Sequence, residues 1–505
     1  MNNETGKLSF DKLFLLSGIY ALFYTFCLYR NRMGLTFPVF VLGTAVLFLY
    51  YLRLTARALK AGSALYLGGI QLLGLNVCLT SNEIVILFDK GFIFLLFFML
   101  FLHNLYDDST WDVSKYILSL CGCVLSSVKF LPRPVKDLGA YLKGRRAEET
   151  SGVVCHEEAK NSATEVEATP EVASTAAALY VLIGLGISLP LLAVILPLLL
   201  SSDVIFQDFF KNMFDFSLEV DPGAVLFMMI AVFVACYGML CRFGQPMKFV
   251  AAPVTDKRKY SPVIAITVNL VLLVVYLLYC GIQVIYLFMR RGTLPEGYTY
   301  SSYAHEGFFQ LVFVCLINIV LVLICRKYST DNLVLKSLFC LISACTYVMI
   351  ASAAYRMYLY IAAYKLTFLR LYVLWALAVM AVVMAGIIVY LFLPRMPFAR
   401  FAAGVLVGLW MIFAYAKPDY QIAAYNIQYH DDDSYILRLS FDAVPAIEKY
   451  DKSGELLSDY FNYGDYPYYE SNRTGGALQG RKRSLRTWNY SLQETYRIYD
   501  KYKVK

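Results

Sequence analysis

Long apolar runs recur along most of this chain and are separated by short polar stretches. Each run approaches the length of about 20 residues that an α-helix needs to cross the hydrocarbon of a bilayer. About eleven such spans are predicted, namely residues 13–29, 37–51, 63–79, 91–105, 176–200, 224–240, 263–289, 308–324, 337–363, 371–393 and 401–414. The runs do not alternate apolar with polar residues, as the strands of a membrane barrel would. The pattern therefore predicts an all-α integral membrane protein.

One stretch in the N-terminal part fits this pattern less well. Trp111–Leu131 is apolar in the middle but carries Asp112, Lys115 and Lys129, and it is followed by Pro132. Such a mixture is typical of an amphipathic helix that lies in the membrane interface. We predict an interfacial helix here, and a further span remains the alternative.

A second stretch departs from the pattern entirely. Residues 136–172 begin with basic side chains and continue as an acidic run rich in Ser, Thr and Ala. Low hydrophobicity of this kind predicts a disordered linker. The chain is thereby divided into N-terminal membrane helices with the interfacial helix (1–135), a cytoplasmic linker (136–172), a C-terminal membrane bundle (173–416) and a tail (417–505).

The tail is polar and aromatic, with fourteen tyrosines among 89 residues, too many aromatics for a typical disordered segment. Ser491–Glu494 has the sequence of a helix capping box. It is followed by apolar and aromatic side chains at helical spacing, namely Leu492, Tyr496, Tyr499 and Tyr502. We predict a small, α-containing module that folds against one face of the membrane part.

The orientation follows from the basic residues in the short loops. One side carries Arg53, Arg57, Lys60, the cluster within 136–146, Arg242, residues 257–259, Arg326, Lys327, Arg395 and Arg400. On the other side, residues 201–221 hold five acidic side chains against Lys211. The basic side is predicted to be cytoplasmic, which places the N-terminus inside and the tail outside the cell. Arg30, Arg32, Arg290 and Arg291 fall on the opposite side from this rule.

Composition agrees with a membrane protein. The chain has 505 residues, of which 59% are hydrophobic and 16% charged, and its mean hydropathy is +0.57. Its net charge of +8 is distributed over the loops and forms no single basic patch, so a nucleic-acid partner is not expected. Most of the twelve cysteines lie inside apolar runs, where they pack as small apolar groups rather than as a disulfide framework.

The candidate site lies between residues 303 and 370, where ionisable and amide side chains accompany strongly apolar spans. These are His305, Glu306, Gln310, Asn318, Arg356, Lys365 and Arg370. A charge at the centre of a membrane helix costs about 2.5–3.5 kcal/mol, so such residues mark functional sites by default. The predicted topology brings Glu306, Arg356 and Arg370 toward the outer leaflet.

Two stripes of side chains would face each other there. Arg356, Tyr360 and Tyr364 share one face of a helix, and Glu306 and Gln310 share a face of the preceding helix. A carboxylate that faces a guanidinium satisfies the charge of both.

Three interpretations of this set remain open. The charged groups form a structural lock between helices, they line a tyrosine-rich pocket for an anionic or polar ligand, or they snorkel to the interface. The candidate residues are Glu306, Gln310, Arg356, Tyr360, Tyr364 and Arg370.

The sequence gives little support for a metal site or a known catalytic motif. Cys121 and Cys123, and likewise Cys155–Glu157, lack the partner pair of a zinc site. Asp431–Asp433 lacks the downstream Gly and Glu of an EF-hand loop and is expected to be a solvated turn. Phosphate-loop, nucleophile-elbow and HExxH motifs do not occur. We predict no metal and no cofactor.

Three motifs carry a resemblance to a known family. They are YAHEGFFQL at 303–311, AYRMYLYIAAYKLTFLRLY at 354–372 and YILRLSFDAVP at 435–445. They resemble the uncharacterised bacterial membrane family catalogued as domain of unknown function 4153, or its relative 4173. Lys365 stands where that family usually has glycine, and Trp488 and Asn489 are similar to its terminal W-x-x-x-N region, although their spacing differs from it. The resemblance implies a multi-pass bacterial membrane protein without an assigned activity.

Two classes of function follow. The first is a non-enzymatic protein of the bacterial plasma membrane that binds a ligand or an envelope partner at an outward polar pocket or through the tail, for sensing, assembly or transport. The second is a membrane enzyme acting on an anionic envelope lipid or glycan precursor, with Glu306 as general base and the arginines holding the anion. We favour the first, because intramembrane charge marks pathways and binding sites more readily than reactions.

Overall fold

The structure is a computed structural model that describes residues 9–109, 111–141, 221–245, 247, 250, 260–285, 300–393, 395–429, 434–463 and 485–503. The side chains of residues 300–309 are outside this description. Several predictions fall on the remaining residues and therefore lie outside the described part. These are the span at 176–200, the acidic loop up to residue 220, the linker from residue 142 onward, Cys155–Glu157 and Asp431–Asp433.

Nine helices of the described part are long and apolar enough to cross a membrane. They are α1 (Phe10–Leu28), α2 (Thr36–Leu54), α4 (Glu83–Leu105), α9 (Pro222–Phe243), α11 (Pro262–Gln283), α12 (Tyr300–Tyr328), α13 (Leu333–Tyr364), α14 (Phe368–Phe392) and α15 (Phe398–Tyr415). The predicted all-α, multi-pass architecture is confirmed. The count of eleven is not, because α3 (Ser63–Leu79) has only 17 residues and the span at 176–200 is not described.

The chain forms two compact units, which are described separately. The first comprises residues 1–32, 39–60 and 120–250. Within it α1 packs along α9, and the hydroxyl groups of Tyr20 and Thr44 are hydrogen-bonded at 2.9 Å between α1 and α2. The Tyr51 hydroxyl donates to the carbonyl of Leu240 in α9. Helix packing and a few polar contacts thus hold this unit together.

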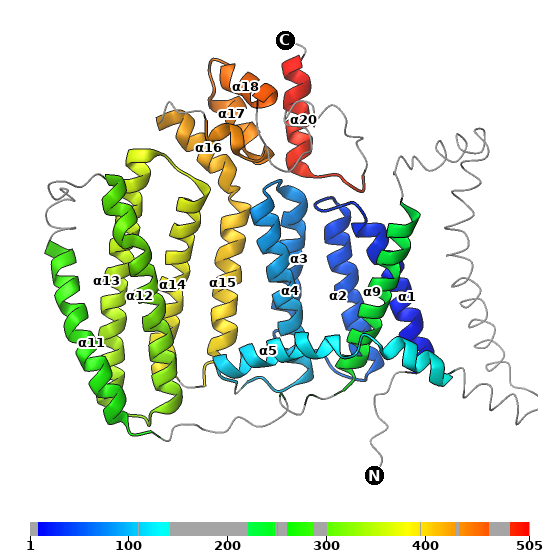
Figure 1. The fold of residues 1–505 in the computed structure, drawn as a ribbon, viewed down its shortest axis with the longest axis horizontal. Helices are drawn as coiled ribbons and strands as arrows, with labels where there is room; N and C mark the ends of the chain where they lie inside the picture. Colours follow the sequence, from blue (N-terminus) through cyan, green and yellow to red (C-terminus); the bar gives the residue numbers. More distant parts are fainter. Residues whose placement is uncertain are drawn as a thin grey trace, which may run out of the picture. The chain divides into compact units, whose positions relative to one another are not determined.

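The second unit comprises residues 33–38, 61–119 and 251–505. Figure 1 shows α11–α15 standing beside the α3–α4 pair. In this unit α13 contacts α11, α12 and α14, while α15 contacts both α14 and α3. Its apolar core includes Val322, Leu335, Phe339, Met384, Ile387 and Leu391. Gly386 is required for the close approach of α14 and α15, since a Cβ atom there would lie 2.1 Å from the Phe401 ring.

The beginning of α4 differs from the sequence prediction. The predicted span begins at residue 91, but α4 starts at Glu83 and includes the residues in between. The physical reason is a local cap: Asn82 Oδ1 accepts a hydrogen bond from the main-chain N–H of Val85 at 3.0 Å. The apolar run that follows then continues directly into the span.

The stretch predicted to lie in the interface forms α5 (Val113–Val128), followed at a 49° bend by the helix Arg133–Tyr141. The bent pair together meets the length and apolarity of one span, so an interfacial helix and a further span both remain open. Helical structure also continues to Tyr141, into the first residues of the predicted linker.

The tail is a small helical module, as expected. It contains α16 (Pro418–Tyr429), the short 3-10 helices η2 (Ile436–Arg438) and η3 (Phe441–Ala443), α17 (Val444–Tyr450), α18 (Glu455–Tyr463) and α20 (Tyr490–Lys503). Buried Leu492, Tyr496 and Tyr499 confirm the predicted apolar face of α20. The predicted capping box is wrong, because α20 begins before Ser491 and Asn489 Oδ1 caps it by accepting from the N–H of Leu492 at 3.2 Å.

Candidate functional site

Of the predicted pair Glu306 and Arg356, the structure describes only the side chain of Arg356. Glu306 lies in α12, but its side chain is outside the described residues, and Gln310 is exposed. Arg356 is 8% exposed, and one of its guanidinium nitrogens donates to Gln283 Oε1 of α11 at 3.1 Å. The Ser352 hydroxyl donates to the same oxygen at 2.7 Å. The pairing of Arg356 with Glu306 stays a prediction, while Gln283 is a partner that the sequence reading missed.

Asn318, the amide in the middle of α12, has a structural place. Its Nδ2 donates to the Thr346 hydroxyl of α13 at 2.9 Å, and its Oδ1 accepts from the Tyr276 hydroxyl of α11 at 2.7 Å. The side chain is fully buried. Both ends of the amide are therefore satisfied between three helices, which is how a polar group is accommodated inside a membrane bundle.

Three other predicted site residues do come together, at the turn between α13 and α14. The Arg370 guanidinium lies 4.0 Å from the centre of the Tyr360 ring, and it donates to the carbonyl of Lys365. The rings of Tyr360 and Tyr364 are 5.3 Å apart. Tyr364 is 41% exposed and Arg370 is half-buried, so this arginine–tyrosine cluster is open to its surroundings.

The turn itself has an unusual backbone. Lys365, which stands in place of the family's glycine, has φ +91° and ψ 164°. This region is populated almost entirely by glycine, and another residue there is strained by on the order of 1–3 kcal/mol. The surrounding contacts must therefore hold the turn in this conformation.

Replacing Lys365 with glycine is expected to stabilise the protein by about 1 kcal/mol, since the relief of backbone strain exceeds the entropy that glycine adds to the unfolded chain. Thermal unfolding in detergent would measure the gain. Lys452→Gly, in an exposed turn where φ is not positive, is the control and should give no stabilisation. A loss of stability in Lys365→Gly would show that the side chain, and not the backbone, matters at this position.

The tail is hydrogen-bonded to the main chain of this turn. Asn426 of α16 accepts from the N–H of Leu366 at 2.8 Å and donates to its carbonyl at 2.9 Å. The Tyr435 hydroxyl accepts from the N–H of Phe368 at 3.0 Å. A buried main-chain group without a partner is costly, so these bonds fix the tail to the start of α14.

A second and larger contact joins the tail to the loop between α3 and α4. We call it the tail junction, and its members are Thr80, Ser81, Asn82, Asp419, Ser440, Asp442, Asn489 and Ser491. All eight are between 0 and 7% exposed. The Thr80 hydroxyl and the N–H of Ser81 donate to Asp442, and Asn82 Nδ2 donates to Asp419 at 2.8 Å.

Asp419 is one of the two buried carboxylates of the tail junction. Besides Asn82, it accepts from the main-chain N–H of Ser440 at 3.1 Å and from the Ser440 hydroxyl. Burial away from water raises the pKa of Asp419, the hydrogen bonds from Ser440 and Asn82 lower it, and the nearby Asp442 raises it; the net direction is upward. The two carboxylates thus share an enclosed site in which neutral donors face them.

The last helix of the tail enters the same junction. Asn489 Nδ2 donates to the carbonyl of Thr80 at 2.9 Å and contacts those of Met33 and Val77 at 3.1 and 3.4 Å. The hydroxyl groups of Ser491 and Ser81 are 3.1 Å apart. One amide therefore binds the end of α3, the segment before α2 and the start of α20.

Sequence reasoning predicted no contact among the residues of the tail junction. Ser81 and Asn82 fall between the spans predicted at 63–79 and 91–105, and Ser440 and Asp442 entered only as matches to the family motif. The available signal was the spacing of polar residues within an otherwise apolar tail segment, since Leu439, Phe441 and Val444 are buried beside them. The bonds between the α3–α4 loop and the tail join residues that are hundreds of positions apart, which no local pattern reveals.

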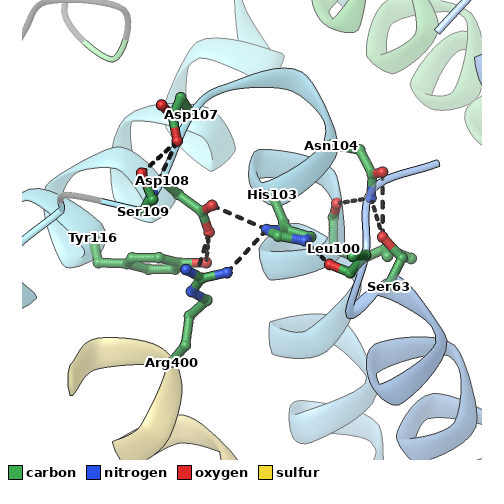
Figure 2. Close-up of polar contacts among 10 residues, drawn as sticks. Ser63, Leu100, His103, Asn104, Asp107, Asp108, Ser109, Tyr116 and Arg400 are labelled. Atoms are coloured by element: carbon green, nitrogen blue, oxygen red, sulfur yellow. Dashed lines mark hydrogen bonds and ion pairs between the residues drawn. The ribbon is translucent and has the colours of Figure 1, made fainter. Parts of the chain in front are cut away.

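The other end of α4 carries a separate cluster, shown in Figure 2. His103 Nδ1 lies 3.0 Å from Asp108 Oδ1, and the Tyr116 hydroxyl donates to Asp108 Oδ2 at 3.1 Å. Arg400 Nε, at the start of α15, lies 3.7 Å from Asp108 Oδ2. His103 and Asp108 are both buried, so the carboxylate joins α4, α5 and α15 in a closed polar contact.

A histidine next to an aspartate can serve as a general base, which requires one ring nitrogen to reach a substrate. Here His103 Nε2 lies 3.0 Å from the carbonyl of Ala61, just before α3. Both ring nitrogens therefore already have protein partners. The arrangement fits a clamp between the loop before α3 and the turn after α4 better than a catalytic pair.

Metal chemistry gains no support from the geometry. Within the described residues, no group of three or more His, Cys, Asp or Glu side chains is placed to hold an ion. Eleven cysteines are free in that part of the chain, and most are buried among apolar neighbours.

Comparisons with known proteins point to one family. No curated protein and no solved structure matches the chain. The model of the family described as domain of unknown function DUF4153 matches residues 67–450, which include most of α3, all of α4, the C-terminal bundle and the tail up to the end of α17. The match covers well over half of the chain. This multi-pass membrane protein therefore belongs to the DUF4153 family.

Proposed function

We propose that this protein binds an anionic ligand or partner group on the face of the membrane bundle that carries the tail, at the cluster of Arg370, Tyr360 and Tyr364. A guanidinium presents several N–H donors in a plane and is suited to carboxylate and phosphate groups. Tyrosine hydroxyls beside it add neutral donors. The proposal is of a binding function, in line with the preference drawn from the sequence.

One observation carries the proposal. Arg370 is half-buried, and its contacts are the carbonyl of Lys365 and the ring of Tyr360. In the part of the chain that the structure describes, no carboxylate lies within ion-pair distance of it. A partly desolvated cation held by a carbonyl and an aromatic face keeps most of its donors for an anion.

The test uses two probes, inorganic phosphate and phosphatidylglycerol in nanodiscs, with phosphatidylcholine nanodiscs as reference. A ligand that binds the native state stabilises it by about 2.7 kcal/mol at one hundred times its dissociation constant. We expect one of the anions to raise the unfolding temperature of the wild type, and Arg370→Gln to abolish that rise. Stabilisation by phosphate alone would identify a soluble anion, and by phosphatidylglycerol alone a lipid headgroup.

Arg497→Gln is the matched control, because Arg497 is 74% exposed and pairs with Glu494 on the tail surface. It should keep the full ligand-induced rise. The readout is the shift caused by the probe, so a lower starting stability of Arg370→Gln does not affect it. An equal rise in Arg370→Gln and the wild type would reject the site.

We also propose that the tail lies outside the cytoplasm, with the membrane being a bacterial plasma membrane as the family resemblance implies. Support comes from Arg326, Lys327, Lys336, Arg395 and Arg400, which all belong to the helix ends away from the tail. A cysteine at exposed Lys452 should react with a membrane-impermeant thiol reagent in intact cells. Protection of that cysteine until lysis would reverse the orientation.

A further inference from the structure

A buried carboxylate inside the membrane bundle has no role in the site described above. Asp89 lies about 9 Å into α4 from its first residue and is fully buried. Asn76 Nδ2 of α3 donates to Asp89 Oδ2 at 2.7 Å, and Trp410 Nε1 of α15 donates to Asp89 Oδ1 at 2.8 Å. We propose that Asp89 is a proton-binding site within the membrane, in equilibrium with the face that carries the tail.

The neighbours of Asp89 fit a proton and no larger cation. A metal ion requires several oxygen ligands, whereas both groups on the carboxylate are N–H donors. Trp410 is itself fully buried, and the rings of Phe88, Phe92 and Trp375 lie 4.8, 5.6 and 5.3 Å from it. An organic cation would have to displace this packed aromatic cluster. A proton needs no such space.

The hydrogen-bond partners suit both protonation states. The ionised carboxylate accepts one N–H at each oxygen, as the structure has it. When one oxygen binds a proton from water, the Asn76 side chain can rotate and accept that O–H with its carbonyl. Trp410 still donates to the other oxygen. The reaction is binding and release of a proton, with no other bond made or broken.

No cation neutralises the charge of Asp89 in the described part of the chain. The titratable group near it is Tyr415 of α15, which itself lies close to Cys78 of α3, and the ring of Tyr372 in α14 is 6.5 Å from that of Trp410. Lys90, next to it in α4, lies over the ring of Phe37 at 5.1 Å. An ionised carboxylate without a cation is costly inside a membrane. Binding of a proton removes this charge and its cost.

The polar groups next to Asp89 continue toward the tail junction. Toward the tail, the main-chain carbonyl of Asn76 accepts from the main-chain N–H of Thr80 at 3.1 Å. The Thr80 hydroxyl in turn donates to Asp442 in the tail junction. Toward the other end of α4, the buried side chains between Asp89 and the polar cluster at His103 are all apolar, among them Ile93, Leu96 and Leu100. Protons therefore reach Asp89 from the tail junction.

The experiment is an infrared pH titration of the full chain in nanodiscs, which follows the C=O stretch of protonated carboxyl groups and, in parallel, tryptophan emission. Besides the titration of other carboxyl groups such as Asp419, we expect one transition that is present in the wild type and in Asp107→Asn, a change at an exposed carboxylate. The transition should be missing in Asp89→Asn. Its persistence in Asp89→Asn, or its absence from the wild type over the range in which the protein stays folded, would overturn the proposal.

A second variant keeps the test decisive if Asp89→Asn does not fold. Trp410→Phe removes one donor to the ionised form, so the midpoint should rise by roughly one to two pH units. In vesicles with one orientation, emission should follow the pH on the tail side. An unchanged midpoint in Trp410→Phe, or a response to the pH on the other side, would contradict the assignment.

Discussion

Replacement of Asp108 with alanine is expected to reduce the free energy of unfolding by about 3 kcal/mol. The change removes the shared acceptor of His103, Tyr116 and Arg400 in Figure 2 and leaves their polar atoms enclosed. Loss of one partner of a buried charged pair costs about 3–5 kcal/mol. The Arg400 side chain is 25% exposed, which places the expected loss at the lower end. Denaturation in detergent at increasing dodecyl sulfate would measure it.

The neighbouring Asp107 provides the control for this change. Asp107 is exposed and accepts only from Ser109 among the contacts described in Figure 2. Asp107→Ala should therefore change stability by less than about 0.5 kcal/mol. Equal losses for the two variants would show that the buried cluster contributes no more than a surface turn.

Replacement of Asn489 with alanine is expected to have a similar effect by a different route. The change removes the Nδ2 donor to the carbonyls of Met33, Val77 and Thr80, as well as the cap of α20. A buried acceptor left without a donor costs about 1–3 kcal/mol, and a lost helix cap adds about 1 kcal/mol. The total loss of stability is about 3 kcal/mol, and it weakens the docking of α20 in particular.

Limited proteolysis would distinguish local release from global unfolding. We expect α20 to be cleaved much faster in Asn489→Ala while the membrane bundle stays intact. Asn462→Ala, at an exposed amide of α18 that donates to Ser458, is the control and should be cleaved like the wild type. Equal cleavage of α20 in all three proteins would show that Asn489 does not hold it.

The membrane helices could be predicted from the sequence because their signal is local. A run of apolar residues determines a span wherever its neighbours lie, and the predicted runs correspond closely to α1, α2, α9, α11, α13, α14 and α15. The errors occurred where a polar residue changes the boundary. Asn82 caps α4 earlier than hydropathy suggests, and Asn489 caps α20 before the serine that resembled a cap.

The candidate site could be predicted only in part. The helical spacing of Tyr360 and Tyr364 brought them together correctly, and Arg370 joins them across the turn. The partner of Arg356 was predicted to be a carboxylate on α12, whereas the described contact is a neutral amide of α11. Helix neighbours in a membrane bundle depend on packing, which a single sequence does not encode in any short pattern.

The tail junction has a consequence for the order of biosynthesis. Ser81 and Ser491 are 410 residues apart in the chain, and Asn489 and Met33 are 456 apart. At a synthesis rate of about 5–20 residues per second, the α3–α4 loop is made roughly 20–80 s before its last partner. During that interval Thr80, Ser81 and Asn82 have to find water or a chaperone as their hydrogen-bond partner. Synthesis of α20 is then the event that completes the tail junction, so a ribosome that stops before α20 leaves a membrane-inserted protein with an open polar loop.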